Sequence, residues 1–84
     1  MNSKQRRTLK AIFAKPTRSD LAWVDVEALI LALGAQRSEG AGSRGRFLLN
    51  GTRITLHRPH PQHEASKAQI DSVRDFLIAA EVKA

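Results

Sequence analysis

The stretch that decides the fold is RGRFLLNGTRITLH, residues 44–57. Both halves alternate apolar and polar side chains with the period of two that is typical of half-buried strands. The pair Asn50-Gly51 separates the halves, and an Asn-Gly pair between alternating runs is the strongest local signal for a two-residue hairpin. The sequence therefore predicts strands over 44–49 and 52–57, joined by a tight turn.

A two-residue turn also fixes which residues of the two strands lie opposite one another. Arg44 is then opposite His57, and Phe47 is opposite Ile54. Because side chains alternate across a strand, one face becomes apolar and the other basic. The face turned to the core is predicted to hold Gly45, Phe47, Leu49, Thr52, Ile54 and Leu56. The open face is predicted to hold Arg44, Arg46, Leu48, Arg53, Thr55 and His57.

The residues before the hairpin predict two helices. The first covers 3–14, with Ser3 as its N-cap, and ends before Pro16 because proline removes an amide donor and clashes with the preceding turn. The second covers 24–33 and ends at Gly34, which suits the position after a helix. Its buried face has apolar residues at i, i+3, i+4 and i+7, namely Val26, Leu29, Ile30 and Leu33.

Two further elements complete the predicted fold. Residues 36–39 form a short first strand, and Ser66 with Gln69 fits the capping box that begins a helix running to about residue 80. The order is helix, helix, three strands, helix. This order predicts an α+β fold in which helices pack on one face of a three-stranded antiparallel sheet.

Composition narrows the class of protein. The chain has 84 residues, which suits one domain, and no cysteine, which excludes disulfides and thiolate metal sites. No stretch approaches the ~20 apolar residues of a membrane span, and the charged N-terminus lacks a signal-peptide core. We therefore expect a soluble cytoplasmic protein. Its 14 lysines and arginines against eight acids give a net charge of +6, which favours an anionic partner.

The positive charge is concentrated on the predicted sheet and its loops. Between residues 36 and 63 the single acid is Glu39, whereas the arginines are Arg37, Arg44, Arg46, Arg53 and Arg58. Arginine suits phosphate because its planar fork donates two hydrogen bonds at once. Aromatic residues are scarce, so binding through phosphates and backbone shape is favoured over base stacking. The alternative is a basic surface that only keeps the protein soluble.

All three histidines, His57, His60 and His63, lie within seven residues. A metal site would need three or four converging ligands, and a plain polar loop is a second alternative. The third interpretation is acid–base chemistry, because imidazole exchanges protons near neutral pH. A histidine beside arginines suits metal-independent RNA cleavage, in which a base activates the ribose 2′-hydroxyl and arginines stabilise the charged transition state.

The succession of Leu33-Gly34-Ala35, Gly42-Ser43-Arg44, the hairpin, His60-Pro61 and a closing helix resembles the HicA toxins. This resemblance covers about residues 22–82, so it implies an N-terminal helical extension over 1–20 and a HicA-like domain over 21–84. It implies a fold like the double-stranded RNA-binding domain. It also implies a toxin of a type II toxin–antitoxin system that cleaves mRNA without metal or other cofactor, and a HicB-type antitoxin as partner.

One position departs from the family pattern, which reads Gly-Ser-His with a catalytic histidine where this chain has Arg44. The candidate catalytic residues are therefore Arg44, His57 and His60. The candidate RNA-binding residues are Arg37, Arg46, Arg53 and Arg58. Arginine stays protonated and is a poor base, so a second hypothesis is an RNA-binding module that does not cut RNA. A third is an antitoxin-binding protein that has lost nuclease activity.

Overall fold

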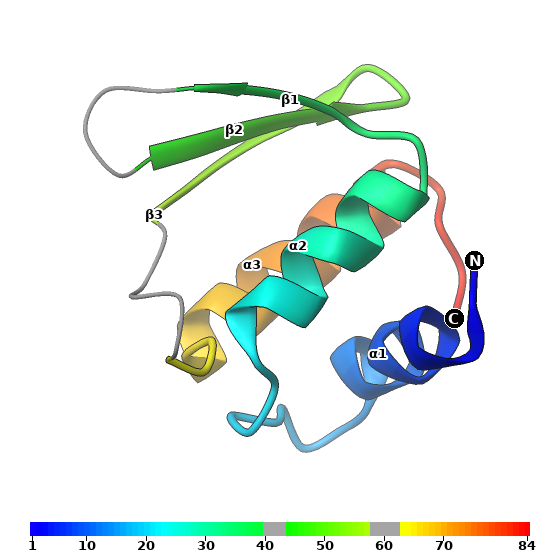
Figure 1. The fold of residues 1–84 in the computed structure, drawn as a ribbon, viewed down its shortest axis with the longest axis vertical. Helices are drawn as coiled ribbons and strands as arrows, with labels where there is room; N and C mark the ends of the chain where they lie inside the picture. The colour runs from blue at the N-terminus through cyan, green and yellow to red at the C-terminus, as the bar shows by residue number, and fades with distance from the viewer. Residues whose placement is uncertain (40–43, 58–62) are drawn as a thin grey trace.

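The structure is a computed structural model that describes residues 1–39, 44–57 and 63–84. Its elements in chain order are α1 (Ser3–Phe13), α2 (Trp23–Ala32), β1 (Gln36–Glu39), β2 (Arg44–Leu49), β3 (Thr52–His57) and α3 (Lys67–Ala79). In Figure 1 α2 and α3 lie beneath one face of the sheet, and the other face is open. The predicted α+β order and the three-stranded antiparallel sheet are confirmed.

The sheet has the strand order β1-β2-β3, and the predicted hairpin register is confirmed at all six pairs, from Leu49 opposite Thr52 to Arg44 opposite His57. Asn50 and Gly51 have φ values of 50° and 78°, as a type I′ turn requires at both central positions. The Asn50 side chain donates a 2.8 Å hydrogen bond to the Ala80 carbonyl. The turn is therefore tied to the end of α3.

The core lies between the sheet and the helices α2 and α3, and it continues between these two helices and α1. Its largest fully buried side chains are Phe47, Ile12, Leu29, Ile30, Ile70, Leu77, Val26 and Val73. On the hairpin, the inner positions alternate with exposed ones as predicted, although Thr52 and Ile54 are half-buried rather than buried. The capping box of Ser66 with Gln69 is present at the start of α3.

The first helix, α1, forms a third layer on the side of α2 and α3 away from the sheet (Figure 1). Its Leu9 and Ile12 belong to the common core. The predicted N-cap Ser3 is wrong, because Asn2 caps the helix. The Asn2 side chain accepts a 2.8 Å hydrogen bond from the Gln5 amide, and the Gln5 side chain accepts one of 3.0 Å from the Asn2 amide. This reciprocal pair places the capping box one residue earlier.

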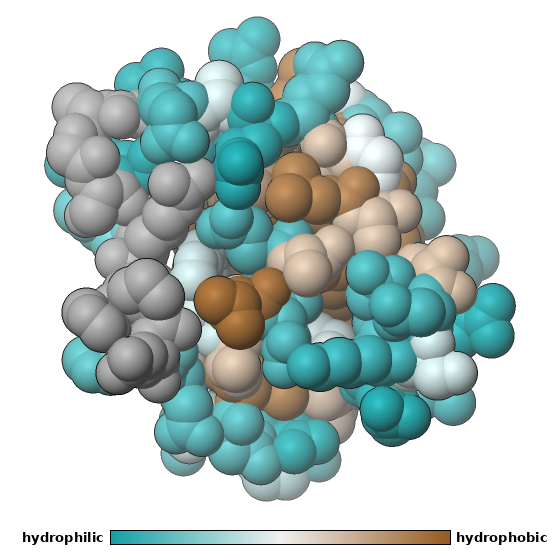
Figure 2. All heavy atoms as spheres, in the orientation of Figure 1, coloured by the Kyte–Doolittle hydropathy of each residue, from teal (hydrophilic) through white to brown (hydrophobic). Residues whose placement is uncertain are grey.

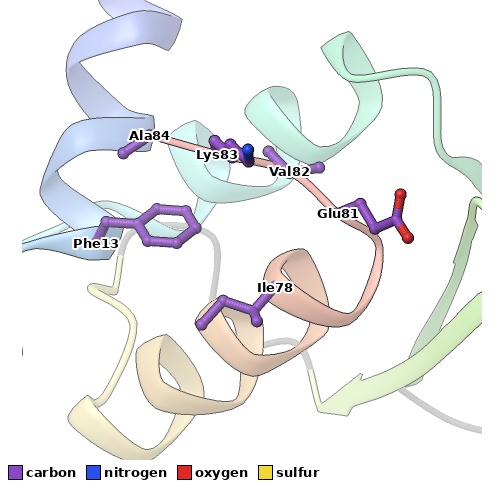
Figure 3. A pocket seen from close by; sticks show the side chains of 6 residues that line it. All are labelled: Phe13, Ile78, Glu81, Val82, Lys83 and Ala84. Carbon is purple, nitrogen blue, oxygen red and sulfur yellow. The ribbon is translucent and has the colours of Figure 1, made fainter.

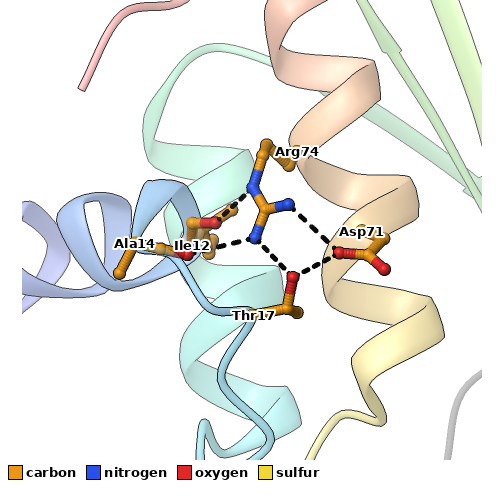
Figure 4. A network of polar contacts seen from close by, with 5 residues as sticks. All are labelled: Ile12, Ala14, Thr17, Asp71 and Arg74. Atoms are coloured by element: carbon orange, nitrogen blue, oxygen red, sulfur yellow. Dashed lines mark hydrogen bonds and ion pairs between the residues drawn. The ribbon is translucent and has the colours of Figure 1, made fainter.

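A buried arginine of α3 holds the end of α1 (Figure 4). Arg74 donates hydrogen bonds to the carbonyls of Ile12, at 2.8 Å, and Ala14, at 3.3 Å. It also donates to the Thr17 hydroxyl at 3.0 Å and to the Asp71 carboxylate at 3.1 Å. The last carbonyls of a helix have no hydrogen-bond donor within the helix, so Arg74 supplies the donors that α1 lacks at its end.

An apolar hollow of about 750 Å³ lies between the end of α1 and the C-terminal residues. Phe13 and Ile78 face it from the two helices, while the Glu81 carboxylate points away (Figure 3). No cluster of polar side chains converges on it, so it offers no acid–base chemistry. None of the helices within the described residues is long and apolar enough to cross a membrane.

Candidate nucleic-acid interface

The open face of the sheet, which we call the outer face, carries side chains from all three strands. Residues directly paired in a sheet share a face, so the register assigns each strand's contribution. From β1 these are Gln36 and Ser38; from β2, Arg44, Arg46 and Leu48; and from β3, Arg53, Thr55 and His57. The three arginines and His57 are all exposed.

None of the chain's acidic side chains lies on this outer face. The eight are Asp20, Asp25, Glu27, Glu39, Glu64, Asp71, Asp75 and Glu81. They belong to the helices, to the segments that flank them, or to the inner side of β1. The charge of +6 is therefore distributed unevenly, and the potential over the outer face is positive without a carboxylate to offset it locally.

Arg46 lies at the centre of the outer face. Its neighbours across the two ladders are Ser38 on β1 and Thr55 on β3, so a guanidinium is flanked by two hydroxyls. A shallow hollow of about 500 Å³ lies over this region and reaches Arg53. Guanidinium and hydroxyl groups are the side chains that commonly bind phosphate oxygens. This part of the sheet can therefore hold a nucleic-acid backbone.

Arg44 and His57 form the end pair of the hairpin. Directly opposed residues of an antiparallel pair have their Cα atoms about 4.5–5.5 Å apart, so both side chains can reach one phosphate. The Gln69 side chain donates a 2.8 Å hydrogen bond to the His57 carbonyl. The same Gln69 is the third residue of the α3 capping box, so the start of α3 fixes the backbone at His57.

Sequence reasoning did not anticipate that Gln69 holds His57. The capping box was readable from the Ser-x-x-Gln spacing, but the contact joins residues twelve positions apart through the tertiary fold. The contributions of Gln36 and Ser38 were also missed. A strand over 36–39 was predicted without its register, and only the register says which of its side chains face outward.

Arg37 is separated from the other candidate RNA-binding residues. It is paired with Phe47 and therefore lies on the inner side of β1. Its guanidinium forms a 2.7 Å ion pair with Glu27 of α2. Part of its charge is thus engaged within the protein, whereas Arg46 and Arg53 project from the outer face.

Two candidates, Arg58 and His60, lie outside the described residues. His63 is described and exposed, and its carbonyl accepts a hydrogen bond from the Trp23 amide at 3.3 Å. Across residues 1–39, 44–57 and 63–84, no group of three His, Asp or Glu side chains is placed to hold a metal ion. The described geometry brings together Arg44, Arg46, Arg53 and His57.

These features define a small α+β domain with helices on one face of an antiparallel sheet and a basic, acid-free outer face. Comparison with protein families matches residues 23–82 to the family described as the HicA toxin of bacterial toxin–antitoxin systems. The chain belongs to this family. Comparison with curated proteins and with solved structures finds no match. The match begins at the first residue of α2, so α1 lies outside it.

Proposed function

We propose that this protein is a toxin that cleaves mRNA on the outer face of its sheet, as an endoribonuclease that needs no metal. The observation that carries the proposal is the pairing of Arg44 with His57 on a face that also holds Arg46 and Arg53. A positive, acid-free surface attracts the phosphate backbone, and a histidine within that surface supplies a group able to take up a proton.

The proposed reaction is an intramolecular phosphoryl transfer. His57 removes the proton from a ribose 2′-hydroxyl, the 2′-oxygen forms a bond to the adjacent phosphorus, and the bond from phosphorus to the 5′-oxygen breaks. A general acid returns a proton to that 5′-oxygen, leaving a 2′,3′-cyclic phosphate and a 5′-hydroxyl. Arg44 stabilises the negative charge that develops on the phosphoryl oxygens. His60, the third candidate catalytic residue from the sequence, lies outside the described residues and is assigned no step here.

The same surface is proposed to bind the antitoxin. Family membership implies a HicB-type partner, and a partner with acidic side chains would neutralise the outer face and cover Arg44 and His57 together. Inhibition would then need no conformational change in the toxin, because occupation of the face excludes RNA. Arg46 and Arg53 would contribute to both complexes.

A second candidate function is RNA binding without cleavage, and Arg44 is the observation that favours it. Arginine stays protonated, so it cannot take the role of base that a histidine at this position would have. The two functions differ in one measurable respect, the appearance of RNA fragments.

The test compares His57→Ala with His63→Ala, since His63 is also an exposed histidine but lies beyond the hairpin. Each variant is induced in cells with and without a HicB-type antitoxin, and each purified protein is incubated with labelled RNA. We expect His57→Ala to lose cleavage and growth inhibition while keeping its circular dichroism spectrum, and His63→Ala to keep both activities. Full toxicity of His57→Ala would refute the assigned base.

Two changes at Arg44 separate the candidate functions. Arg44→Lys keeps the positive charge and should retain part of the cleavage, whereas Arg44→Gln should lose cleavage and bind RNA more weakly. Unmodified protein that binds RNA tightly but yields no fragments on long incubation would establish the second candidate instead. The end groups of any fragments report the mechanism, because only 2′-hydroxyl attack leaves a cyclic phosphate.

A further inference from the structure

The net positive charge of the chain arises in its first 19 residues. Six of the 14 lysines and arginines, and none of the eight acids, lie in residues 1–19. The other eight bases are balanced by the eight acids, all in residues 20–84. Most of the N-terminal excess belongs to α1, which lies outside the residues matched to the family and which the proposed function does not use.

The bases of α1 form a stripe on its solvent side. Ser3, Arg6, Arg7 and Lys10 follow the spacing i, i+3, i+4 and i+7, which places them on one face of a helix. All four are exposed, whereas the opposite face of α1 is buried. We call Arg6, Arg7 and Lys10 the α1 stripe. In Figure 2 hydrophilic residues cover most of the lower right of the molecule, where Figure 1 places α1.

The charges of the α1 stripe are not used within the protein. Among the described residues, no ion pair or side-chain hydrogen bond involves Arg6, Arg7 or Lys10, whereas the neighbouring Lys4 binds Asp25 at 3.2 Å. Arg6 and Lys10 are about 6 Å apart along the helix axis, at 1.5 Å per residue. The stripe is therefore a row of unpaired cations available to an anion from outside.

The α1 stripe makes the helix less stable than a mixture of charges would. Arg6 and Lys10 are like charges at i and i+4, which repel each other. The first turn of α1 contains no acid, although the helix dipole favours one there. By contrast, α3 combines two bases with two acids. A surface needed only for solubility could include such acids, so the pattern of α1 indicates a requirement for positive potential.

The fold holds the α1 stripe in a fixed place. Leu9 and Ile12, on the buried side of α1, belong to the common core. Arg74 of α3 binds the carbonyls of Ile12 and Ala14 at the end of the helix. The stripe thus projects from a packed helix, on the side of α2 and α3 away from the sheet and its outer face (Figure 1).

The chemistry of this surface favours a nucleic acid over other anionic partners. The exposed residues of α1 include no apolar side chain, whereas the centre of a protein interface is apolar and poor in charge. An amphipathic helix that binds a membrane inserts its apolar face, but that face of α1 is buried in the core. Contacts of arginine and lysine with phosphate need no apolar surface.

We propose that the α1 stripe binds the phosphodiester backbone of a nucleic acid, as a second surface separate from the outer face. Arg6 and Arg7 donate paired hydrogen bonds to phosphate oxygens, and Lys10 adds a compact positive charge. Binding is independent of sequence, because phosphate contacts carry no base information. A strand long enough to reach both surfaces is held more tightly, since its second contact becomes intramolecular.

The test measures the salt dependence of binding to a labelled single strand, prepared as RNA and as DNA of the same sequence. Every protein in it carries Arg46→Gln and Arg53→Gln, which weaken the outer face. Adding Arg6→Gln and Lys10→Gln should reduce the slope of log K against log salt by about 1.4, at about 0.7 for each phosphate contact. Glutamine forms helices about as well as arginine and lysine, so Tm should not fall.

The matched control adds Arg18→Gln and Lys67→Gln instead. These exposed residues lie outside α1 and the outer face, and the control lowers the net charge by the same amount. It should change the slope less than half as much. A smaller slope with RNA alone would identify RNA as the ligand, and one with both strands would identify the shared backbone; both results support the proposal.

Two results would overturn the proposal. One is an unchanged slope with both strands after the α1 substitutions, even if the stripe then binds phosphatidylserine vesicles or polyglutamate. The other is an equal fall in the α1 variant and its control, which would reflect net charge alone. Neither result depends on RNA cleavage or on the outer face, so failure of the proposed function would leave this test intact.

Discussion

Replacing Arg74 with methionine would test how α1 is joined to the rest of the fold. Methionine keeps most of the aliphatic length of arginine but removes every hydrogen bond that the guanidinium donates. Arg74 is only 9% exposed, and its bonds reach the carbonyls of Ile12 and Ala14 at the end of α1. The variant therefore leaves the last turn of α1 without its partners.

The expected loss can be worked out from these contacts. A hydrogen bond to a charged group contributes roughly 1.5–3 kcal/mol, and two such bonds to carbonyls are lost. The bond to the Ile12 carbonyl is buried, whereas the bond to the half-buried Ala14 is long at 3.3 Å and water can replace part of it, so we use the lower end of the range for the pair. The ion pair with half-exposed Asp71 adds at most about 1 kcal/mol. We expect a loss of about 3 kcal/mol in the free energy of unfolding.

A loss of this size is large for an 84-residue chain, whose total stability is on the order of 4–13 kcal/mol. Thermal unfolding followed by circular dichroism should show a fall in Tm of roughly 12–24 °C, because 1 kcal/mol corresponds to about 4–8 °C at this size. Urea unfolding of the same samples supplies the free energy directly. A loss below about 1 kcal/mol would refute the view that Arg74 anchors α1.

The matched control is Arg18→Met, the same substitution at an arginine whose carboxylate partner lies in the solvent. Arg18 binds Asp20 through two hydrogen bonds of 2.8 and 2.7 Å, which lower the pKa of the Asp20 carboxyl. Both side chains are exposed, so water screens the pair and removing it costs little. We expect this variant to unfold at the same Tm as the unmodified protein.

Three further predictions concern the hairpin and its outer face. Gly51→Val should lower the free energy of unfolding by about 1–2 kcal/mol in urea titrations, because valine is strained at a φ of 78°; an unchanged midpoint would contradict the assigned turn. Replacing both Arg46 and Arg53 with glutamine should reduce the slope of log K against log salt by about 1.4 for single-stranded RNA; an unaltered slope would remove the outer face from consideration. Gln69→Met should lower the rate of RNA cleavage with little change in RNA affinity, since it releases the His57 carbonyl without touching the outer face; equal losses in rate and affinity would indicate a general disturbance of the fold.

Local signals in the sequence predicted most of the fold. The Asn50-Gly51 turn, the alternation of the flanking strands and the capping box of Ser66 with Gln69 each involve residues close in sequence, and all three were confirmed. The error at the start of α1 has a local cause as well. Asn2 and Ser3 are both good N-cap residues, and the choice depends on Gln5, which lies three residues after Asn2 and completes its capping box.

The features that the sequence did not reveal depend on contacts between distant residues. In the sequence Arg74 looks like an ordinary charged residue of a helix. It is buried because it binds two carbonyl groups of another helix, and these lie 60 and 62 positions earlier in the chain. In the same way, the four residues of β1 are enough to predict a strand, but they do not indicate which face of that strand is turned toward the core. Arg37 and Arg46 look equivalent in the sequence, and only the pairing of β1 with β2 separates them.

The pairing of β1 with β2 also explains how a chain with eight acidic residues can have an outer face without any acidic side chain. A shift of one residue in the pairing of β1 would turn Glu39 to the outer face and withdraw Ser38 from its place beside Arg46. The ion pair between Arg37 and Glu27 opposes such a shift, because the observed register is the one that brings Arg37 beneath the sheet toward α2. An inward-facing contact therefore helps to keep the outer face free of carboxylates, and the positive charge on which the proposed RNA binding relies depends in part on a residue on the opposite side of the sheet.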